Sequence, residues 1–141
     1  GSVACWGLTR YGQAPRDGVE GPFVQVSAGG LHSLGLRKDG SVACWGCNAQ
    51  GQAPPPAGPW RAGSARASAR ASRGASPERF VQVSAGCYHS LALRADGSVA
   101  CWGSNAHGQA PPEGVEGPFI QVSAGFKHSL GLRADGSVAC W

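Results

Sequence analysis

The hexapeptide Gly-Ser-Val-Ala-Cys-Trp occurs four times in this chain, beginning at positions 1, 40, 97 and 136. A second motif, Val/Ile-Gln-Val-Ser-Ala-Gly, begins at positions 24, 81 and 120, and two variable residues separate each copy from His-Ser-Leu-Gly/Ala-Leu-Arg. Repeats of this length are supersecondary units that bury their apolar faces by stacking on one another. The sequence therefore predicts a single domain over 1–141, with units at about 8–46, 47–103 and 104–141, and with 1–7 as the last strand of a preceding unit.

The second unit is longer than the others by 18 residues, and this excess falls at about 59–76. The segment is rich in Ala, Ser, Gly and Arg without apolar periodicity, so we expect a flexible insertion loop. It contains four of the twelve basic residues, which leaves eight basic and eight acidic residues elsewhere. A solvated loop is the simplest interpretation. Contact of this basic loop with nucleic acid, chromatin or an acidic protein, contact through Trp60, and phosphorylation of Ser68 or Ser72 are open alternatives.

Each unit contains an Asp-Gly pair between two apolar-rich runs. Asp-Gly tolerates the positive φ angles of a two-residue type I′ turn, so we expect a β-hairpin in every unit. In the first unit the expected pairs are Leu36 with Ala43, Leu34 with Trp45, and Gly35 with Cys44. This register gives the hairpin a bulky face with Leu, Trp and His32, and a small face with Gly and Cys.

A sheet of about three short strands with two apolar faces cannot bury either face alone, but stacking the bulky face of one unit on the small face of the next covers both. The composition agrees, since 23 glycines and 10 prolines indicate many turns rather than long helices. We predict an all-β fold, a partial β-propeller of about three blades that forms an open arc rather than a closed ring. The chain lacks methionine, so we expect it to be a piece of a longer protein.

The residues that recur in every unit are interpreted as structural. A catalytic base is needed once, whereas a packing or hydrogen-bonding histidine is needed in every blade. Separate blades also hold the histidines too far apart to share a metal ion. The recurring cysteines suit small core positions, which disfavours disulfides between blades and weakly favours an intracellular location, in the cytoplasm or nucleus. These structural positions are His32, His89, His128, Trp6, Trp45, Trp102, Trp141, Cys5, Cys44, Cys101, Cys140, Asp39, Gly40, Asp96, Gly97, Asp135 and Gly136.

Cys44 and Cys47 form a Cys-x-x-Cys pair, which makes a thiol oxidoreductase an alternative function. That chemistry needs a thiolate of lowered pKa, commonly at a helix N-terminus. Here the pair ends an expected strand and no helical pattern follows it, so we do not favour this alternative. We expect no enzymatic activity, no catalytic residue, no cofactor and no metal ion. No run of apolar residues is as long as a membrane-spanning segment.

The consensus of the units, QVSAGxxHSLGLRxDGSVACWGxNxxGQ, resembles the repeat of the regulator of chromosome condensation family. Its short period is similar to that of the branch that includes the propeller-type β-lactamase inhibitory protein. The resemblance implies a propeller, usually of seven blades, that recognises proteins through loops on one face. Members of the family include a guanine-nucleotide exchange factor for a small nuclear GTPase, so exchange activity is an alternative to a scaffold role. None of the exchange factor's functional residues can be carried over to this sequence.

Function is expected where the units differ rather than where they agree. The variable pairs follow Ser-Ala-Gly or precede Gly-Gln, and aromatic and basic residues are prominent among them. We predict a non-enzymatic protein-interaction module, and we expect the isolated chain to self-associate through its open ends. The candidate partner-binding residues are Arg10, Tyr11, Leu31, Gln50, Cys87, Tyr88, His107, Phe126 and Lys127.

Overall fold

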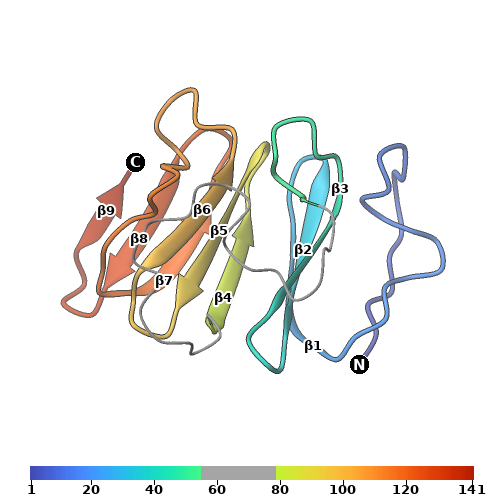
Figure 1. Ribbon diagram of the computed structural model, residues 1–141, viewed down its shortest axis with the longest axis horizontal. Coiled ribbons are helices and arrows are strands. Elements are labelled where there is room, and N and C mark those ends of the chain that lie inside the picture. Colours follow the sequence, from blue (N-terminus) through green and yellow to red (C-terminus); the bar gives the residue numbers. More distant parts are fainter. Residues whose placement is uncertain (55–78) are drawn as a thin grey trace.

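The computed structural model describes residues 1–54 and 79–141, and these residues form strands, turns and loops without a helix (Figure 1). The strands are β1 (Phe23–Ala28), β2 (His32–Arg37), β3 (Val42–Gly46), β4 (Phe80–Ala85), β5 (His89–Arg94), β6 (Val99–Gly103), β7 (Phe119–Ala124), β8 (Ser129–Arg133) and β9 (Val138–Cys140). The insertion predicted at 59–76, including Trp60, lies outside the described residues. Within the described ranges, no helix is long and apolar enough to cross a membrane.

The strands form three antiparallel sheets, in the orders β1-β2-β3, β4-β5-β6 and β7-β8-β9. The sheets stand side by side like blades, with β1 beside β4 and β4 beside β7, and the arc is open at both ends (Figure 1). Each first strand has a bulge near its start, between Phe23 and Gln25 in the first blade. This architecture confirms the predicted all-β fold and the partial propeller of three blades.

The Asp-Gly turns differ from the prediction by one residue. In the first blade the backbone N–H of Arg37 donates to the carbonyl of Ser41 (2.8 Å), and that of Gly40 donates to the carbonyl of Arg37 (3.0 Å). The loop therefore has three residues, 38–40, and ends at Gly40, whose φ of 84° is left-handed. Asp39 Oδ1 accepts hydrogen bonds from the backbone N–H and from the hydroxyl of Ser41, at 2.9 and 2.7 Å. The predicted two-residue type I′ turn is wrong.

One extra loop residue shifts the third strand of each blade by one position, which exchanges its two faces. The observed pairs are Leu36 with Val42, Gly35 with Ala43, and Leu34 with Cys44. The other two blades share this register. Cysteine therefore lies opposite leucine on the bulky face, and tryptophan lies on the small face with glycine and alanine. The predicted assignment of these two residues to faces is wrong, whereas His32 keeps its predicted place on the face of Leu34.

The hydrophobic core lies between the blades. The bulky face of the first blade packs against the second through the following buried residues: Leu34, Leu36, Val42 and Cys44 on one side, and Phe80, Val83, Ala92, Ala100 and Trp102 on the other. The second and third blades repeat this contact with Leu91, Leu93, Val99 and Cys101 against Phe119, Val122, Ala139 and Trp141. Unlike faces stack, as predicted, although cysteine and tryptophan have exchanged places.

Polar side chains of each first strand also bridge to the next blade. Gln25 Oε1 accepts a hydrogen bond from the backbone N–H of Val83 (3.0 Å), and its Nε2 donates to the carbonyl of Val83 (3.3 Å). Ser27 Oγ accepts from the backbone N–H of Ala85 (3.0 Å). The second blade makes the same bonds to the third. These side chains bind backbone groups, which accounts for the recurrence of Gln and Ser in the Gln-Val-Ser motif.

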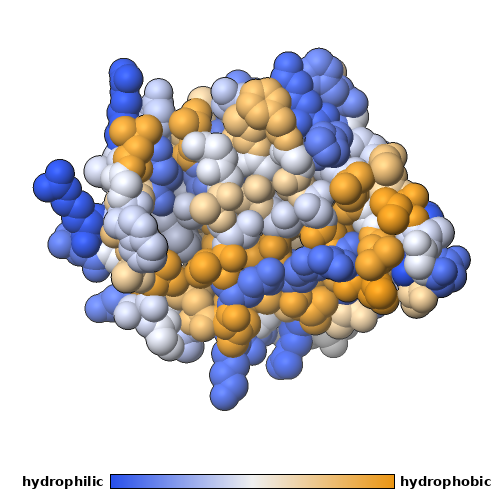
Figure 2. Space-filling model, turned by 180° about the vertical axis from the view of Figure 1, so that it is seen from behind, coloured by the Kyte–Doolittle hydropathy of each residue, from blue (hydrophilic) through white to orange (hydrophobic). Residues whose placement is uncertain are grey.

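Outside the named strands, Val3 pairs with Val19 as Val99 pairs with Val115. Val3 therefore lies relative to Val19 as Val99, in the last strand of the second blade, lies relative to Val115, whereas the prediction that 1–7 is the last strand of a preceding unit stays a prediction. The unit boundaries at about 8–46, 47–103 and 104–141 stay predictions. One equivalent position of each first strand carries an exposed aliphatic side chain, namely Val24, Val81 and Ile120. Figure 2 shows an apolar band across the side opposite to that seen in Figure 1.

Candidate functional site

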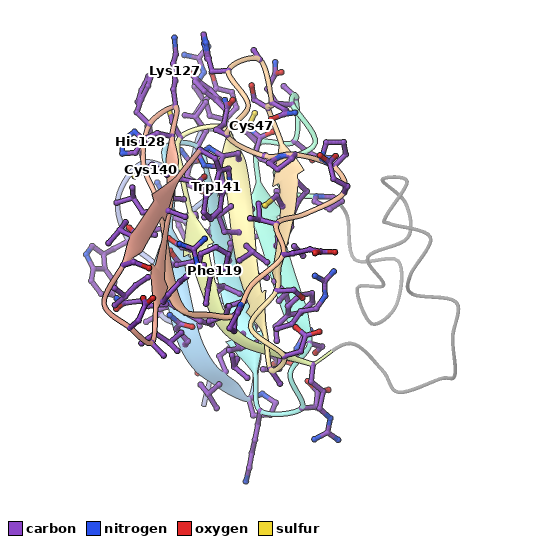
Figure 3. The ribbon with its side chains drawn as sticks, turned by 90° about the vertical axis from the view of Figure 1, so that its left-hand side faces the viewer. Cys47, Phe119, Lys127, His128, Cys140 and Trp141 are labelled. Atoms are coloured by element: carbon purple, nitrogen blue, oxygen red, sulfur yellow. The ribbon has the colours of Figure 1, made fainter. Side chains whose placement is uncertain are left out.

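The loops that connect the strands gather at one end of the arc, because the three strands of each blade alternate in direction. Backbone hydrogen bonds join these loops: Cys47 N–H donates to the carbonyl of Leu31, and Ser104 N–H to that of Tyr88, both at 2.8 Å. Cys47 and Lys127 lie at this same end (Figure 3). We define the loop face as residues 8–12, 29–31, 47–51, 86–88, 104–108 and 125–127, and the turn face, at the opposite end, as residues 38–40, 95–97 and 134–136.

The recurring His-Ser pairs join neighbouring blades beneath the loop face. His32 Nε2 lies 2.8 Å from Ser90 Oγ, and Ser90 Oγ donates to the carbonyl of Gln52 at 3.0 Å. The second and third blades repeat this chain of contacts at 3.0 and 2.8 Å. Because the serine proton goes to the carbonyl, histidine Nε2 must carry a proton and donate to the serine. The predicted buried, hydrogen-bonded histidine is present, and its partner is a side chain of the next blade.

Their burial keeps His32 and His89 neutral. Burial, followed by the proximity of His89, lowers the pKa of His32 to about 4, and burial also lowers the pKa of His89. Nδ1 of each ring is buried and has no hydrogen-bond partner among the described residues, so a second proton would lack an acceptor. His128 lies at the open end of the arc and is exposed (Figure 3). Within 1–54 and 79–141, no three His, Cys, Asp or Glu side chains come together as a metal site.

Two of the four recurring cysteines, Cys44 and Cys101, are core thiols as predicted, whereas Cys5 is half-buried and Cys140 is exposed, because each lies at an end of the arc. Burial raises the pKa of Cys44 and of Cys101 to about 12. A thiol with such a pKa stays protonated at neutral pH and is a poor nucleophile. Cys47 is half-buried at the start of its loop, and all six cysteines are free. This arrangement opposes the oxidoreductase alternative, which needs a thiolate at Cys44.

The recurring Trp and Gln residues fix the loops. Trp45 Nε1 donates to the carbonyl of Gln13 at 3.1 Å, and Trp102 Nε1 donates to that of Gln52 at 2.9 Å. The side chain of each Gln also accepts a hydrogen bond from the backbone N–H two residues earlier in its loop. The loop face is therefore built on a repeated, hydrogen-bonded framework. Trp6, at the first end of the arc, is exposed.

All nine candidate partner residues lie in segments of the loop face. The structure brings five of them into a row across the three blades, which we call the aromatic-cationic belt: Arg10, Tyr11, Tyr88, Phe126 and Lys127. The guanidinium carbon of Arg10 lies 5.7 Å from the centroid of the Tyr11 ring, and Nζ of Lys127 lies 5.8 Å from that of Phe126. The Tyr88 and Phe126 rings meet edge to face, with centroids 6.1 Å apart. Tyr11 is 44% and Phe126 59% exposed.

Tyr88 lies at the centre of the belt. The charge of Cys87, with which Tyr88 also shares a hydrogen bond, raises the pKa of Tyr88, and Cys47 and Tyr11 add to this effect. Cys47 and Tyr11, which belong to two other loops, are near enough to Tyr88 to influence its pKa. Cys47 was not among the predicted partner residues. Its signal in the sequence is that the equivalent positions hold Leu8 and Ser104.

The remaining candidates lie on the loop face but outside the belt. Leu31 accepts the hydrogen bond from Cys47 through its carbonyl. The backbone N–H groups of Gln50 and His107 donate to the Gln side chains that close their loops, both at distances below 3 Å. These contacts are made by main-chain atoms. The side chains of Gln50 and His107 are exposed, and their assignment as partner residues stays a prediction.

A family model for the regulator of chromosome condensation (RCC1) repeat matches residues 23–52, 80–109 and 119–141. These segments make up more than half of the chain, and each begins at the first strand of a blade. Comparison with curated protein sequences gives no significant match.

Several solved structures share the fold. Human WBSCR16 is similar with a TM-score of 0.67 and 22% identity, covering 96% of this chain and 41% of its own. Yeast RCC1 (Prp20), solved with bound Kap60, is similar with a TM-score of 0.66 and 21% identity, and the match covers 96% of this chain and 38% of the yeast chain. Prp20p from Saccharomyces cerevisiae was described with its binding properties to Gsp1p and histones. Its TM-score is 0.58 at 22% identity, and the match covers 84% of this chain and 32% of Prp20p. The chain thus spans about two-fifths or less of the length of these structures, and at this identity the similarity is one of fold.

Proposed function

Because the chain belongs to the regulator of chromosome condensation (RCC1) repeat family, we propose that it is a non-enzymatic protein-interaction module whose loop face binds a partner. The observation that carries the proposal is the contrast between the recurring side chains, which make contacts inside the arc, and the variable side chains of the loop face. Recurring His, Ser, Gln, Cys and Trp side chains are engaged within and between the blades. Variable aromatic and basic side chains gather on one face and stay exposed. Tyr, Phe and Arg are the residue types that anchor protein interfaces.

The way in which the loops are held supports the same proposal. Asn48 Oδ1 accepts a hydrogen bond from the backbone N–H of Ala53 at 3.0 Å, and Asn105 makes the equivalent bond at 2.9 Å. Together with the Trp and Gln contacts, these bonds restrict the loops before any partner arrives. A pre-ordered surface loses less conformational entropy on binding, which favours affinity.

Photo-crosslinking in the full-length parent protein tests which face meets the partner. A benzophenone amino acid is placed at Tyr88 on the loop face or at Lys38 on the turn face, and adducts are identified by mass spectrometry after irradiation in extracts of the source organism. We expect a partner adduct from Tyr88 that Phe126→Ala weakens, and none from Lys38. Adducts that form from Lys38 alone, or equally from both positions, would contradict a role for the loop face.

Guanine-nucleotide exchange on a small GTPase is the more specific form of this function. Its support is the fold shared with Prp20p, the protein described with binding properties to Gsp1p. Release of fluorescent GDP from a panel of small GTPases, measured with the full-length parent, distinguishes exchange from binding alone. Faster release from one GTPase would establish exchange. Unchanged release across the panel, together with crosslinks from the loop face, would leave the interaction module.

A further inference from the structure

The loop face contains positive charge and aromatic rings but no carboxylate. Its segments include Arg10, His107 and Lys127 and neither Asp nor Glu. Elsewhere in the described residues, carboxylates occupy the turn face and the connections 15–21 and 111–117. They are Asp17, Glu20, Asp39, Asp96, Glu113, Glu116 and Asp135. Carboxylates are therefore absent from the loop face, whereas on the turn face they lie beside the cations Arg37, Lys38, Arg94 and Arg133.

Within the loop face, the aromatic-cationic belt has one cation at each end and three aromatic rings between them. Arg10 lies over Tyr11 at one end, and Lys127 lies over Phe126 at the other. Between the two ends, Tyr88 makes a ring contact with Phe126 and lies near enough to Tyr11 for Tyr11 to influence its pKa. A ligand that lies along the belt thus meets a positive charge, then an apolar surface, then a second positive charge.

We propose that the aromatic-cationic belt binds an acidic segment of a partner protein, in which an aromatic or aliphatic side chain is flanked on both sides by carboxylates. This inference rests on the proposed function, and it adds the chemistry of the partner. The flanking carboxylates pair with Arg10 and Lys127, while the central side chain packs on Tyr88 and Phe126. Complementary charge fixes the register of the segment and speeds its association.

The turn face differs from the loop face because ionised carboxylates lie among its cations. Hydrogen bonds from the Ser41 hydroxyl and backbone lower the pKa of Asp39, and the equivalent serines do the same for Asp96 and Asp135. These three carboxylates therefore stay ionised at neutral pH. Arg37, Arg94 and Arg133 lie near these carboxylates, so opposite charges offset one another at the turn face, whereas the loop face has cations without carboxylates.

The same features argue against nucleic acid as the occupant. The belt has two permanent cations, whereas nucleic-acid sites commonly neutralise about six to ten phosphates. Two contacts would give a salt slope of only about −2, which corresponds to weak binding at physiological salt. Two carboxylates separated by an apolar part of the segment match two separated cations better than a continuous phosphate backbone does.

Binding of defined polymers to the full 141-residue chain tests the proposal. The probes are a fluorescent random copolymer of glutamate and tyrosine, polyglutamate, a copolymer of lysine and tyrosine, and oligo(dT), with anisotropy as the readout. We expect the glutamate-tyrosine copolymer to bind most tightly and to weaken as salt rises from about 0.05 to about 0.5 M, because the Debye length shortens severalfold. The lysine-tyrosine copolymer should not bind.

The chain provides a matched pair of variants, since it has only two lysines, one on each face. Lys127→Glu and Lys38→Glu change the net charge equally, and both side chains are exposed. We expect Lys127→Glu to weaken binding of the glutamate-tyrosine copolymer several-fold and Lys38→Glu to leave it unchanged. Phe126→Ala should weaken it about fivefold or more, as truncation of an interface anchor does. Tryptophan fluorescence and thermal melting confirm that each variant is folded.

Protection of the two lysines from acetylation gives a second readout. With the copolymer bound, mass spectrometry should show slower modification of Lys127 and an unchanged rate at Lys38. Equal effects of the two lysine variants on copolymer binding, or binding of polyglutamate or oligo(dT) that is as tight as that of the copolymer and equally weakened by Lys127→Glu, would overturn the acidic-segment proposal. Even if the acidic-segment proposal fails, crosslinks from Tyr88 in the parent protein would still support partner recognition by the loop face. Crosslinks confined to Lys38 would overturn both.

Discussion

At the scale of single residues, the His-Ser-carbonyl chain explains why the histidine recurs in every blade. The serine of the next blade gives its proton to the carbonyl of Gln52, so His32 must donate through Nε2. Nδ1 is then a buried lone pair, and protonation there would create a buried donor without an acceptor. The geometry that bridges two blades therefore also keeps the ring uncharged.

We predict that this arrangement makes stability depend on pH. The pKa of His32 is about 4 when folded and 6.5 when unfolded, so the unfolded chain binds more protons between these values. The free energy of unfolding should therefore fall as the pH drops from about 6.5 towards 4, by about 3 kcal/mol at most for this group. Urea unfolding followed by tryptophan fluorescence across this range measures the effect.

His32→Gln serves as the control, because its amide can still donate to Ser90 but does not titrate. This variant should lose part of the change in the free energy of unfolding between pH 6.5 and pH 4. His89 should contribute to the change that remains, because burial also lowers its pKa. The hydrogen-bonded aspartates contribute in a different window. Their folded pKa values are depressed below 3.8, so their stabilisation is lost as the pH falls below about 4. An unchanged slope in His32→Gln would contradict the assignment to His32.

At the scale of elements, each blade depends on the preceding one for the placement of its first strand. Gln and Ser side chains bind its backbone from one side, and the carbonyl of the turn glycine binds it at its start. The Gly40 carbonyl accepts from Phe80 N–H at 2.9 Å, and the Gly97 carbonyl accepts from Phe119 N–H at 2.8 Å. Neighbouring blades are therefore joined by hydrogen bonds along the whole first strand as well as by apolar packing.

We predict that Gln82→Ala destabilises the chain more than Gln121→Ala does. Gln82 bonds both the N–H and the carbonyl of Val122, whereas Gln121 occupies the same position in the third blade and is exposed. Loss of the first contact leaves backbone groups unpaired and should cost about 1–3 kcal/mol. The second change should stay within about 0.5 kcal/mol. Chemical denaturation measures both, and equal costs would refute a bridging role for this glutamine.

A second pair of variants tests the observed turn. Gly97 and Gly136 both have a φ of 85°, so alanine at either position incurs the left-handed penalty of about 1–2 kcal/mol. A Cβ at Gly97 would also lie 2.8 Å from Pro118 Cα, whereas a Cβ at Gly136 would meet no atom within 4 Å. Thermal unfolding should therefore show a larger loss of stability for Gly97→Ala than for Gly136→Ala. Equal losses would mean that the turn does not contact the next blade.

At the scale of the whole molecule, the arc ends in blade faces that the described residues leave uncovered. On the third blade, Val138 is 55% exposed, whereas the equivalent Val99 is fully buried against the next blade. Cys140 and His128 are exposed on the same blade, although their counterparts Cys101 and His89 are buried. This surface matches the one that each earlier blade presents to its neighbour.

We predict that the 141-residue chain on its own self-associates through this surface, because a bulky blade face is uncovered. Sedimentation velocity should show a mass that rises with protein concentration. Val138→Lys should reduce the association. Val81→Lys, at a similarly exposed position of the middle blade, should not. A monodisperse monomer at every concentration would contradict the prediction.

The sequence by itself determined the architecture, because the same short pattern recurs three times and only stacking can bury its apolar residues. The family resemblance also implied recognition through loops on one face, and the structure places the variable residues in loops at one end of the arc. The sequence did not determine the hairpin register. Asp-Gly suits both a two-residue turn and a three-residue loop that ends in a left-handed glycine, and these differ by one position.

Only the tertiary structure decided which face each third-strand residue occupies. Contacts that are remote in sequence, such as the bond from Phe80 N–H to the Gly40 carbonyl, accompany the three-residue loop that sets this register. The composition of the candidate site was likewise decided by the tertiary structure. Arg10, Tyr88 and Lys127 come from three different loops, and local pattern cannot show that stacking brings them into one belt. Local chemistry in the sequence fixes the elements, whereas register and surface depend on how the blades pack.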